Sequence, residues 1–518
     1  MGNYLNQDGK KFYEITHSDI YVDKTELLTY TNSVLQTLQK YICISRPRRF
    51  GKSITASMIA AYYSRGCDAK ELFSPYKIAR NLDFDTYRNK YNTLFLNMQE
   101  FLSRTKNIYE LLDRMKRLVL RDLKREYQNV DYFDDTDLIE SMQDVYQETN
   151  CPFVVIIDEW DCIFREYKQD KEAQEIYLDF LRDMLKDKSC IALAYMTGIL
   201  PIKKYGTHSA LNMFDEFSMI NPGPLASYVG FTELEVAALC TDYHMDLDEI
   251  KAWYNGYSFE KIPSIYNPRS VVSCMRFGKI GNYWNQTETF EALQIYIDMN
   301  FEGLKDDVLS MIAGESVPVN TGSFTNDMTT FRTEDDVLTL LIHLGYLSYD
   351  YENKTVKIPN NEVREEYVNS VSVSDWGEIS KALKNSAIWQ GRPEQVALGI
   401  QQAHFETSHI QYNDENALSY TVSLALYAAR NFYTIHREFA GGKGFADMVF
   451  LPRKKFPDKP ALVIELKWDH SAQGAITQIK QKQYCESLKE YHGNLLLVGI
   501  NYDTKSRIHT CKIEPFSL

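Results

Sequence analysis

The sequence lacks several features that mark common classes of protein. Its nine cysteines include no Cys-x-x-Cys pair, and its ten histidines are scattered without a zinc-binding or Ser-His-Asp spacing. No apolar run is long enough to cross a bilayer, and the first residues contain no apolar segment of a signal peptide. Asn6 stands where N-myristoylation of Gly2 needs Ser or Thr. We therefore expect a soluble, cytoplasmic protein that does not bind membranes.

The length and the net charge of the chain limit the number of domains and the kinds of partner to expect. At 518 residues the chain is too long for one hydrophobic core, so we expect two or three domains. The net charge of −14 argues against a protein that coats nucleic acid indiscriminately, although a local basic groove remains compatible with it. The sequence contains no internal repeat and no low-complexity tract.

The order of apolar runs and helical patterns indicates an α/β multidomain protein. Short apolar runs alternate with amphipathic helices between residues 20 and 200, which is typical of a parallel sheet with crossover helices. Strands are expected at 41–45, 92–98, 151–161 and 189–198, and helices at 53–64, 107–128 and 172–187. Residues 225–400 are mostly helical, and 334–360 predict a helix and a two-stranded hairpin, similar to a small winged-helix module. Residues 410–518 predict a helix, three strands, a helix and a strand.

The segment "SRPRRFGKS" (45–53) has the properties of a phosphate-binding loop between a strand and a helix. In such a loop, backbone N–H groups and the positive end of the helix surround an anion. Lys52 would bind the terminal phosphates of a nucleotide, and the Ser53 hydroxyl would ligate Mg²⁺. Arg46 stands where this loop normally opens with glycine. The sequence leaves three alternative roles for Arg46, Arg48 and Arg49. They could neutralise phosphate charge, one could act as an arginine finger, or they could be solvated or ion-paired side chains.

A second segment supports a nucleotide site. The apolar run "FVVII" ends in Asp158 and Glu159, and ligands of open α/β sheets bind at the carboxyl ends of the strands. Asp158 would hold Mg²⁺ through water, and Glu159 would act as the general base on the attacking water. The next predicted strand ends in Thr197, a candidate contact of the γ-phosphate.

These segments resemble a bacterial family of AAA-ATPase-like proteins that also carry a C-terminal nuclease-like domain. The resemblance rests on "YVDKTELL" (21–28), "SRPRRFGKS", "VIIDEWD" (155–161), "WYNGYSF" (253–259) and "IYNPRS" (265–270). In that family an arginine is common at the position of Arg46. The residues expected to contact ATP are Arg46, Pro47, Arg48, Arg49, Phe50, Gly51, Lys52, Ser53, Ile54, Asp158 and Thr197.

The C-terminal region contains a second group of charged residues. Two apolar runs, 446–451 and 461–468, flank a polar turn and predict a β-hairpin. If the turn centres on Phe456, residue i pairs with residue 912 − i, and Asp447 faces Glu465 at a Cβ separation of roughly 5 Å. Lys467 lies on the same face of its strand as Glu465. Two carboxylates and a lysine suit one or two Mg²⁺ ions, with Mn²⁺ as an alternative, and a lysine that orients a water.

The Asp…Glu-x-Lys pattern resembles the PD-(D/E)XK nuclease superfamily. This resemblance implies two further residues, Glu415 as a metal ligand and Gln478 as a supporting residue, and Asp414 competes with Glu415. The glycines of "GGKG" (441–444) would allow a phosphate backbone to approach, or would simply form a turn. Basic residues of the hairpin turn and the following helix are candidates for phosphate contacts: Arg453, Lys454, Lys455, Lys480 and Lys482.

The sequence thus predicts an ATPase core at 1–225, a helical lid with a winged-helix-like region at 226–400, and a nuclease-like domain at 401–518. We expect an ATP-dependent or ATP-gated nuclease, with defence against foreign DNA implied by the resemblance. DNA is favoured as the substrate, and RNA stays open as an alternative. Two alternatives remain: a nucleotide-switched scaffold whose tail binds without cutting, and an ATPase that self-associates to supply an arginine finger.

Overall fold

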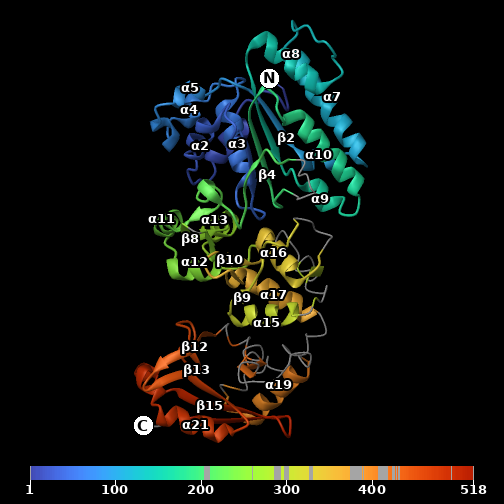
Figure 1. The fold of residues 1–518 in the computed structure, drawn as a ribbon. Coiled ribbons are helices and arrows are strands. Elements are labelled where there is room, and N and C mark those ends of the chain that lie inside the picture. The colour runs from blue at the N-terminus through green and yellow to red at the C-terminus, as the bar shows by residue number, and fades with distance from the viewer. Residues whose placement is uncertain are drawn as a thin grey trace. The chain divides into compact units, whose positions relative to one another are not determined.

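The computed structural model describes residues 2–202, 211–259, 261–284, 303–325, 331–373, 390–406, 432–491 and 493–516, together with scattered residues between these ranges (Figure 1). The chain divides into two compact units. The first contains Met1–Thr287 and Ser316–Arg364, and the second contains Glu288–Glu315 and Glu365–Leu518.

A five-stranded parallel sheet forms the centre of the first unit. Its order is β2-β3-β4-β1-β5. The strands are β1 (Tyr41–Ser45), β2 (Asn92–Asn97), β3 (Phe153–Asp158), β4 (Ile191–Gly198) and β5 (Asp215–Phe217). β1, β3 and β4 are buried along their whole length, because helices cover both faces of the sheet. The four predicted strands are confirmed, and the short β5 was not predicted.

Two groups of helices cover this sheet. Figure 1 shows α2, α3, α4 and α5 on one side and α7, α9 and α10 on the other. The helices are α1 (Lys10–Thr16), α2 (Leu27–Val34), α3 (Lys52–Tyr63), α4 (Lys70–Phe73), α5 (Phe84–Tyr87), α6 (Met98–Leu102), α7 (Ile108–Glu126), α8 (Leu138–Thr149), α9 (Cys162–Glu166) and α10 (Lys171–Leu185), with a 3₁₀ turn η1 (Lys77–Arg80). α7 buries residues at three- and four-residue spacing, including Leu111, Met115 and Val119, as an amphipathic helix should.

The described residues within 218–284 and 316–364 of the first unit form a module of helices and two small sheets. The first sheet, ordered β6-β8-β7, packs with α11–α13. In the second sheet, ordered β10-β11-β9, strand β9 precedes α16. The strands β10 and β11 follow α16 and confirm the predicted helix and hairpin. The elements are η2 (Gly223–Leu225), β6 (Phe231–Thr232), α11 (Glu233–Tyr243), α12 (Leu247–Tyr254), β7 (Tyr257–Phe259), β8 (Ile262–Tyr266), α13 (Pro268–Phe277), β9 (Val317–Pro318), α16 (Glu334–Leu344), β10 (Ser348–Asp350) and β11 (Thr355–Lys357).

Two of the motifs quoted for the family resemblance, "WYNGYSF" (253–259) and "IYNPRS" (265–270), lie in this module and have structural roles. Gly256 adopts a φ of 117°, and a Cβ there would lie 1.9 Å from the carbonyl oxygen of Pro359, so only glycine fits. Asn267 caps α13 by accepting a hydrogen bond from the Arg269 N–H at 2.9 Å, and Pro268 occupies the first helical position.

The second unit contains a five-stranded mixed sheet in the order β12-β13-β14-β15-β16. β14 and β15 are parallel, and the other pairs are antiparallel. Its elements are α15 (Leu304–Ala313), α17 (Asn361–Val373, which begins in the first unit), α19 (Pro393–Glu406), β12 (Tyr433–Gly441), β13 (Gly444–Pro452), β14 (Ala461–Trp468), α21 (Ala472–Gln481), η4 (Tyr484–Tyr491), β15 (Leu495–Asp503) and β16 (Ile508–Pro515). The sequence predicted one strand after α21, whereas the structure has two, because the half-exposed edge strand β16 lacks a continuous apolar run.

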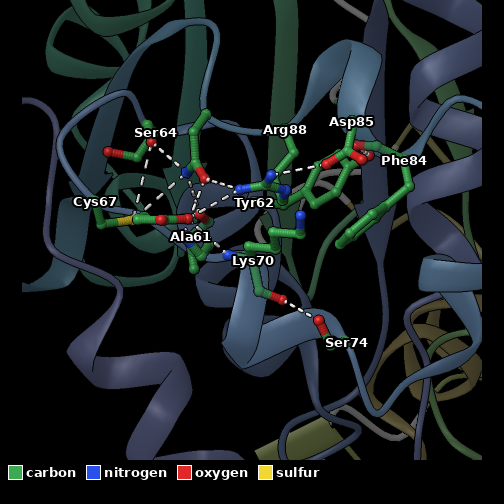
Figure 2. Close-up of polar contacts among 12 residues, drawn as sticks. Ala61, Tyr62, Ser64, Cys67, Lys70, Ser74, Phe84, Asp85 and Arg88 are labelled. Carbon is green, nitrogen blue, oxygen red and sulfur yellow. Dashed lines mark hydrogen bonds and ion pairs between the residues drawn. The ribbon is translucent and has the colours of Figure 1, made fainter.

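A polar network holds the C-terminal end of α3, the helix that follows the candidate phosphate loop. Figure 2 shows Arg88 beside Asp85, and Ser64 and Cys67 grouped around the helix end. The Asn89 side-chain amide donates hydrogen bonds to the carbonyl oxygens of Ser64 at 2.6 Å and Ala61 at 3.4 Å. Ala61 lies in the last turn of α3 and Ser64 is its C-cap residue, so neither carbonyl has an intrahelical partner.

Replacement of Asn89 by alanine is expected to lower the free energy of unfolding of the first unit by about 1–2 kcal/mol, because carbonyls at the end of α3 lose their donor. Urea denaturation followed by circular dichroism measures the change. Asn89 has a φ of 57°, so Asn89→Gly is the matched control, which removes the amide without backbone strain. A stable Asn89→Gly variant beside an unstable Asn89→Ala variant would assign the loss to strain instead.

Candidate functional site

The loop between β1 and α3 closes around the Lys52 ammonium. Gly51 precedes the helix with a φ of 97°, and Arg49 also has a positive φ of 68°. Lys52 Nζ donates hydrogen bonds to the carbonyl oxygens of Arg46 at 3.0 Å and Pro47 at 2.9 Å. Burial lowers the pKa of Lys52, and the carboxylate of Glu159 opposes this shift. The loop thus holds a cation at the N-terminal end of a helix, where an anion is favoured.

Three side chains of this loop, those of Arg46, Pro47 and Phe50, contact the module of helices and small sheets described above. The guanidinium of Arg46 is fully buried, donates to the carbonyl oxygen of Phe217 at 2.9 Å and lies over the ring of Phe259 at 5.0 Å. Burial lowers the pKa of Arg46 to about 9. Pro47 packs against Gly345, where a Cβ would lie 2.7 Å from its ring, and Phe50 meets Tyr257 at a ring separation of 5.3 Å. Among the loop arginines, the exposed side chains are those of Arg48 and Arg49.

Polar side chains meet at the carboxyl ends of β2, β3 and β4. Asn97, Asp158 and Thr197 are in register across these three strands. Thr197 Oγ1 donates to Asp158 Oδ1 at 2.6 Å, and Asn97 Nδ2 donates to Asp158 Oδ2 at 3.2 Å. The Asp158 carboxylate is therefore fixed from both sides, and the Thr197 hydroxyl serves to orient it.

Glu159 follows β3 in a left-handed backbone conformation, with a φ of 56°. Its Oε2 lies 2.5 Å from Nη2 of Arg165, and burial raises the pKa of Glu159. Glu159, Arg165, Ser53 and Arg48 line a cavity of about 730 Å³. Three residues of the predicted nucleotide site, Ser53, Arg48 and Glu159, therefore share one cavity, while Ile54 lies on the first turn of α3 with 41% of its surface exposed.

The second candidate site lies on the β13–β14 hairpin. The strands pair Met448 with Ile464 and Phe450 with Leu462, so the register is the expected 912 − i. Asp447 and Glu465 occupy the next position of this register, where the Asp447 carboxylate accepts the backbone N–H of Leu466 at 2.6 Å. The two carboxylates are thus brought together at the end of the paired segment.

Glu465 is buried beside two other charged side chains, those of Asp447 and Lys467. Its side chain is buried, and Oε1 accepts hydrogen bonds from Gln478 Nε2 and from Lys467 Nζ, the latter at 3.2 Å. Oε2 is buried and makes no hydrogen bond with the described residues. Burial and the neighbouring charge of Asp447 raise the pKa of Glu465 to about 7, although Lys467 acts in the opposite direction.

An unpartnered carboxylate oxygen beside a second carboxylate fits a divalent cation, because oxygen ligands with negative charge are those that Mg²⁺ and Mn²⁺ prefer. Asp447 and Glu465 would hold the ion. The proposed third ligand, Glu415, and its competitor Asp414 lie outside the described residues. Within the part of the chain that the structure describes, no cluster of three His, Cys, Asp or Glu side chains has a metal-binding arrangement.

The glycine run and Lys480, one of the basic residues near this site, have structural partners. Gly442 forms the turn between β12 and β13 with a φ of 53°, and a Cβ there would lie 2.3 Å from the carbonyl oxygens of Lys482 and Gln483. Close packing of the turn against the chain after α21 thus explains a glycine at this position. Lys480 pairs with Glu514 at 2.7 Å. Two basic residues of α7, Arg117 and Lys124, also have acidic partners, at 2.9 and 2.7 Å.

Two family models match the regions that contain these sites. A family described as predicted AAA-ATPase matches residues 10–207, and the PD-(D/E)XK nuclease superfamily matches residues 415–512. The chain joins an AAA-ATPase-like segment to a PD-(D/E)XK nuclease segment. This assignment confirms the resemblance and the fold classes predicted from the sequence.

One curated relative and two solved structures give more distant similarities. An uncharacterized protein in the vnfD 5′ region of Azotobacter chroococcum mcd 1 is 26% identical over 281 residues, which is 52% of this chain and 51% of the relative. The chain therefore spans about half the length of that relative. The ORC2 protein of Aeropyrum pernix with ADPNP and ADP gives a TM-score of 0.31 at 12% identity, covering 72% of this chain and 99% of its own. The ORC1 protein of Aeropyrum pernix in complex with DNA gives a TM-score of 0.25 at 12% identity. The match covers 73% of this chain and 99% of the ORC1 chain.

The AAA-ATPase-like segment also contains polar residues that sequence reasoning missed. Asn97 ends the strand beside β3, and this position alone was a usable signal, since the carboxyl ends of parallel strands meet at one edge. Arg165 lies four residues after Asp161, so a helical turn brings the two side chains together. Its contact with Glu159 depends on the left-handed backbone conformation of Glu159, which the sequence does not reveal. In the nuclease segment, the Tyr484 hydroxyl approaches Gln478 Nε2 at 3.4 Å.

Within the described residues, no helix is long and apolar enough to cross a membrane.

Glu465→Gln is expected to stabilise the metal-free protein by about 1 kcal/mol at pH 8 and to have little effect at pH 5. The raised pKa means that the folded state binds the proton more tightly than the unfolded state, so the cost of the charged group appears as the pH rises through about 7. Thermal melts in EDTA at both pH values measure this difference.

The matched control is Glu514→Gln, since Lys480 lowers the pKa of Glu514 and the substitution removes a favourable charge. An equal effect of Glu465→Gln at pH 5 and pH 8 would contradict an origin in the buried charge.

Proposed function

We propose that this protein is an ATP-dependent or ATP-gated, metal-dependent nuclease that acts on DNA, with defence against foreign DNA as its role. The observation that carries the proposal is the pairing of Asp447 with Glu465 beside Lys467, in a chain that also holds Lys52, Asp158 and Glu159 at one sheet edge. The family matches at both regions support the two halves.

At the nucleotide site the chain's own groups would bind and orient the triphosphate. Lys52 would exchange the carbonyl oxygens of Arg46 and Pro47 for a terminal phosphate oxygen, and the Ser53 hydroxyl and Asp158 would hold Mg²⁺. Glu159 would accept the proton of the attacking water. The acidic edge and the lysine lie close enough to interact electrostatically, as the opposing effect of Glu159 on the pKa of Lys52 indicates.

At the nuclease site a divalent cation would supply charge stabilisation during in-line displacement at phosphorus. Asp447 and Glu465 would hold it, and Gln478 keeps the Glu465 carboxylate in place. Lys467, 3.2 Å from Glu465, would orient the attacking water and help to remove its proton.

The proposal is tested with purified protein on defined double- and single-stranded DNA and RNA, with and without ATP and with Mg²⁺, Mn²⁺ or EDTA. Cleavage of DNA that needs the metal and increases with ATP is the expected result. Intact substrates under all conditions, together with ATP hydrolysis, would refute the nuclease and favour the alternative of a nucleotide-switched scaffold. Sizing with and without ATP tests self-association.

A further inference from the structure

Arg165 on α9 lies between two carboxylates of the segment that follows β3. Its Nη2 is 2.5 Å from Glu159 Oε2, and its Nε is 3.2 Å from Asp161 Oδ2. The side chains of Arg165 and Asp161 are 9% and 0% exposed, so this is not a solvent-screened surface pair of small energetic value. Removal of one partner of such a buried network leaves another charge without compensation.

Asp161 is itself fixed to the end of β4. Its Oδ2 accepts the backbone N–H groups of Ile199 at 3.1 Å and Leu200 at 2.9 Å. These residues directly follow the strand that carries Thr197, whose hydroxyl holds Asp158. Arg165 is therefore attached, through Asp161, to the rigid edge of the sheet at which Mg²⁺ is proposed to bind.

Glu159 needs such support because its backbone is strained. A non-glycine residue with a φ of 56° costs of order 1 kcal/mol or more, and the surrounding structure must hold it there. Arg165 engages only one carboxylate oxygen of Glu159. The other oxygen, Oε1, makes no hydrogen bond with the described residues, and Glu159 lines the same cavity as Ser53.

We propose that Arg165 is a positioning residue for the ATP hydrolysis proposed above. It fixes Glu159 through Oε2 and leaves Oε1 for the attacking water, while Asp161 holds the guanidinium back from that oxygen. The inference rests on the proposed ATPase half of the function and is independent of the nuclease half.

The opposite role, in which the ion pair restrains the base and slows hydrolysis, predicts a different kinetic outcome. Loss of Arg165 would then raise kcat. If Arg165 positions the base, its loss lowers kcat, because a displacement of a reacting group by about 1 Å costs on the order of 100-fold in rate.

The experiment is a double-mutant cycle on the full chain with Arg165→Met, Glu159→Gln and the combined variant. We expect Arg165→Met to lower kcat for ATP hydrolysis about 10- to 100-fold, with the Kd for a fluorescent ATP analogue within about threefold of the wild type. In the Glu159→Gln background the same substitution is expected to have no further effect on kcat. Arg165→Lys should recover part of the rate. Arg182→Met, at an exposed arginine of α10 that pairs with Asp179 at 2.7 Å, is the matched control and should match the wild type.

Several outcomes would overturn the inference. An unchanged or increased kcat in Arg165→Met excludes positioning, and an equal loss in both backgrounds shows that Arg165 does not act through Glu159. A parallel loss of kcat and nucleotide affinity shows a structural role. If Arg165→Met does not fold, Arg165→Lys and Asp161→Asn give the same test, since both alter the support of Glu159. Wild-type protein that binds but does not hydrolyse ATP would refute the proposed ATPase and this inference together, whereas ATP hydrolysis without DNA cleavage would refute only the nuclease.

Discussion

Lys467→Ala is expected to reduce metal-dependent DNA cleavage by at least about 1,000-fold while ATP hydrolysis stays at the wild-type rate. Lys467 is the cation that approaches Glu465 at 3.2 Å, and groups that act as one catalytic unit lose most of their effect when one member is removed. Glu465→Ala should have an effect of the same size, because it removes the carboxylate with the buried, unpartnered oxygen. Cleavage of a fluorescent DNA duplex and phosphate release measure the two activities.

Two controls define what this result means. Lys505→Ala removes an exposed lysine of the same unit and should leave cleavage unchanged. Gln478→Ala removes a group that holds Glu465 without binding the metal, so we expect a smaller loss of about 10- to 100-fold that high Mg²⁺ or Mn²⁺ partly restores. Wild-type cleavage in Lys467→Ala and Glu465→Ala would show that the cutting site lies elsewhere.

Lys52→Ala is expected to lower ATP hydrolysis by about 100- to 1,000-fold, since it removes the positive charge that we propose binds the transferred phosphoryl group. The affinity for ATP should also fall, and ATP-stimulated DNA cleavage should disappear if nucleotide turnover controls the nuclease. Steady-state phosphate release and nucleotide titration separate these effects. Lys10→Ala, at an exposed lysine of α1, is the control.

The combination of these variants distinguishes the two candidate functions. A nuclease loses cleavage in both Lys467→Ala and Lys52→Ala but loses hydrolysis only in Lys52→Ala. A nucleotide-switched scaffold would show no cleavage in any variant and would lose partner binding in Lys52→Ala alone. Hydrolysis in Lys52→Ala within threefold of the wild type would contradict the assignment of the phosphate loop.

The parts of both sites that lie close together along the chain were predictable from the sequence. Lys52 follows a strand and begins a helix, and Asp158 ends an apolar run, so local pattern was sufficient for each. The Asp447–Glu465 register followed from the position of the hairpin turn, because a register shift of one residue would move every side chain to the opposite face.

Contacts that join distant segments could not be derived in this way. Nothing in the sequence distinguishes a buried Arg46 from the exposed Arg48 and Arg49, since burial depends on Phe217 and Phe259 far along the chain. The same holds for Arg165, whose partner Glu159 is reached only through a left-handed turn. The division of the chain into an ATPase core, a lid and a nuclease domain stays a prediction.

The insertion of Arg46, Pro47 and Phe50 into the module has a consequence for how this protein can change during evolution. Exchange of the module for that of a distant homologue would remove the contacts that these side chains make with Phe259, Gly345 and Tyr257. A chimaera of that kind would retain every residue proposed to bind phosphate and still misplace the loop. The loop and the module are therefore expected to be inherited as one unit, with compensating substitutions on both sides of their contact.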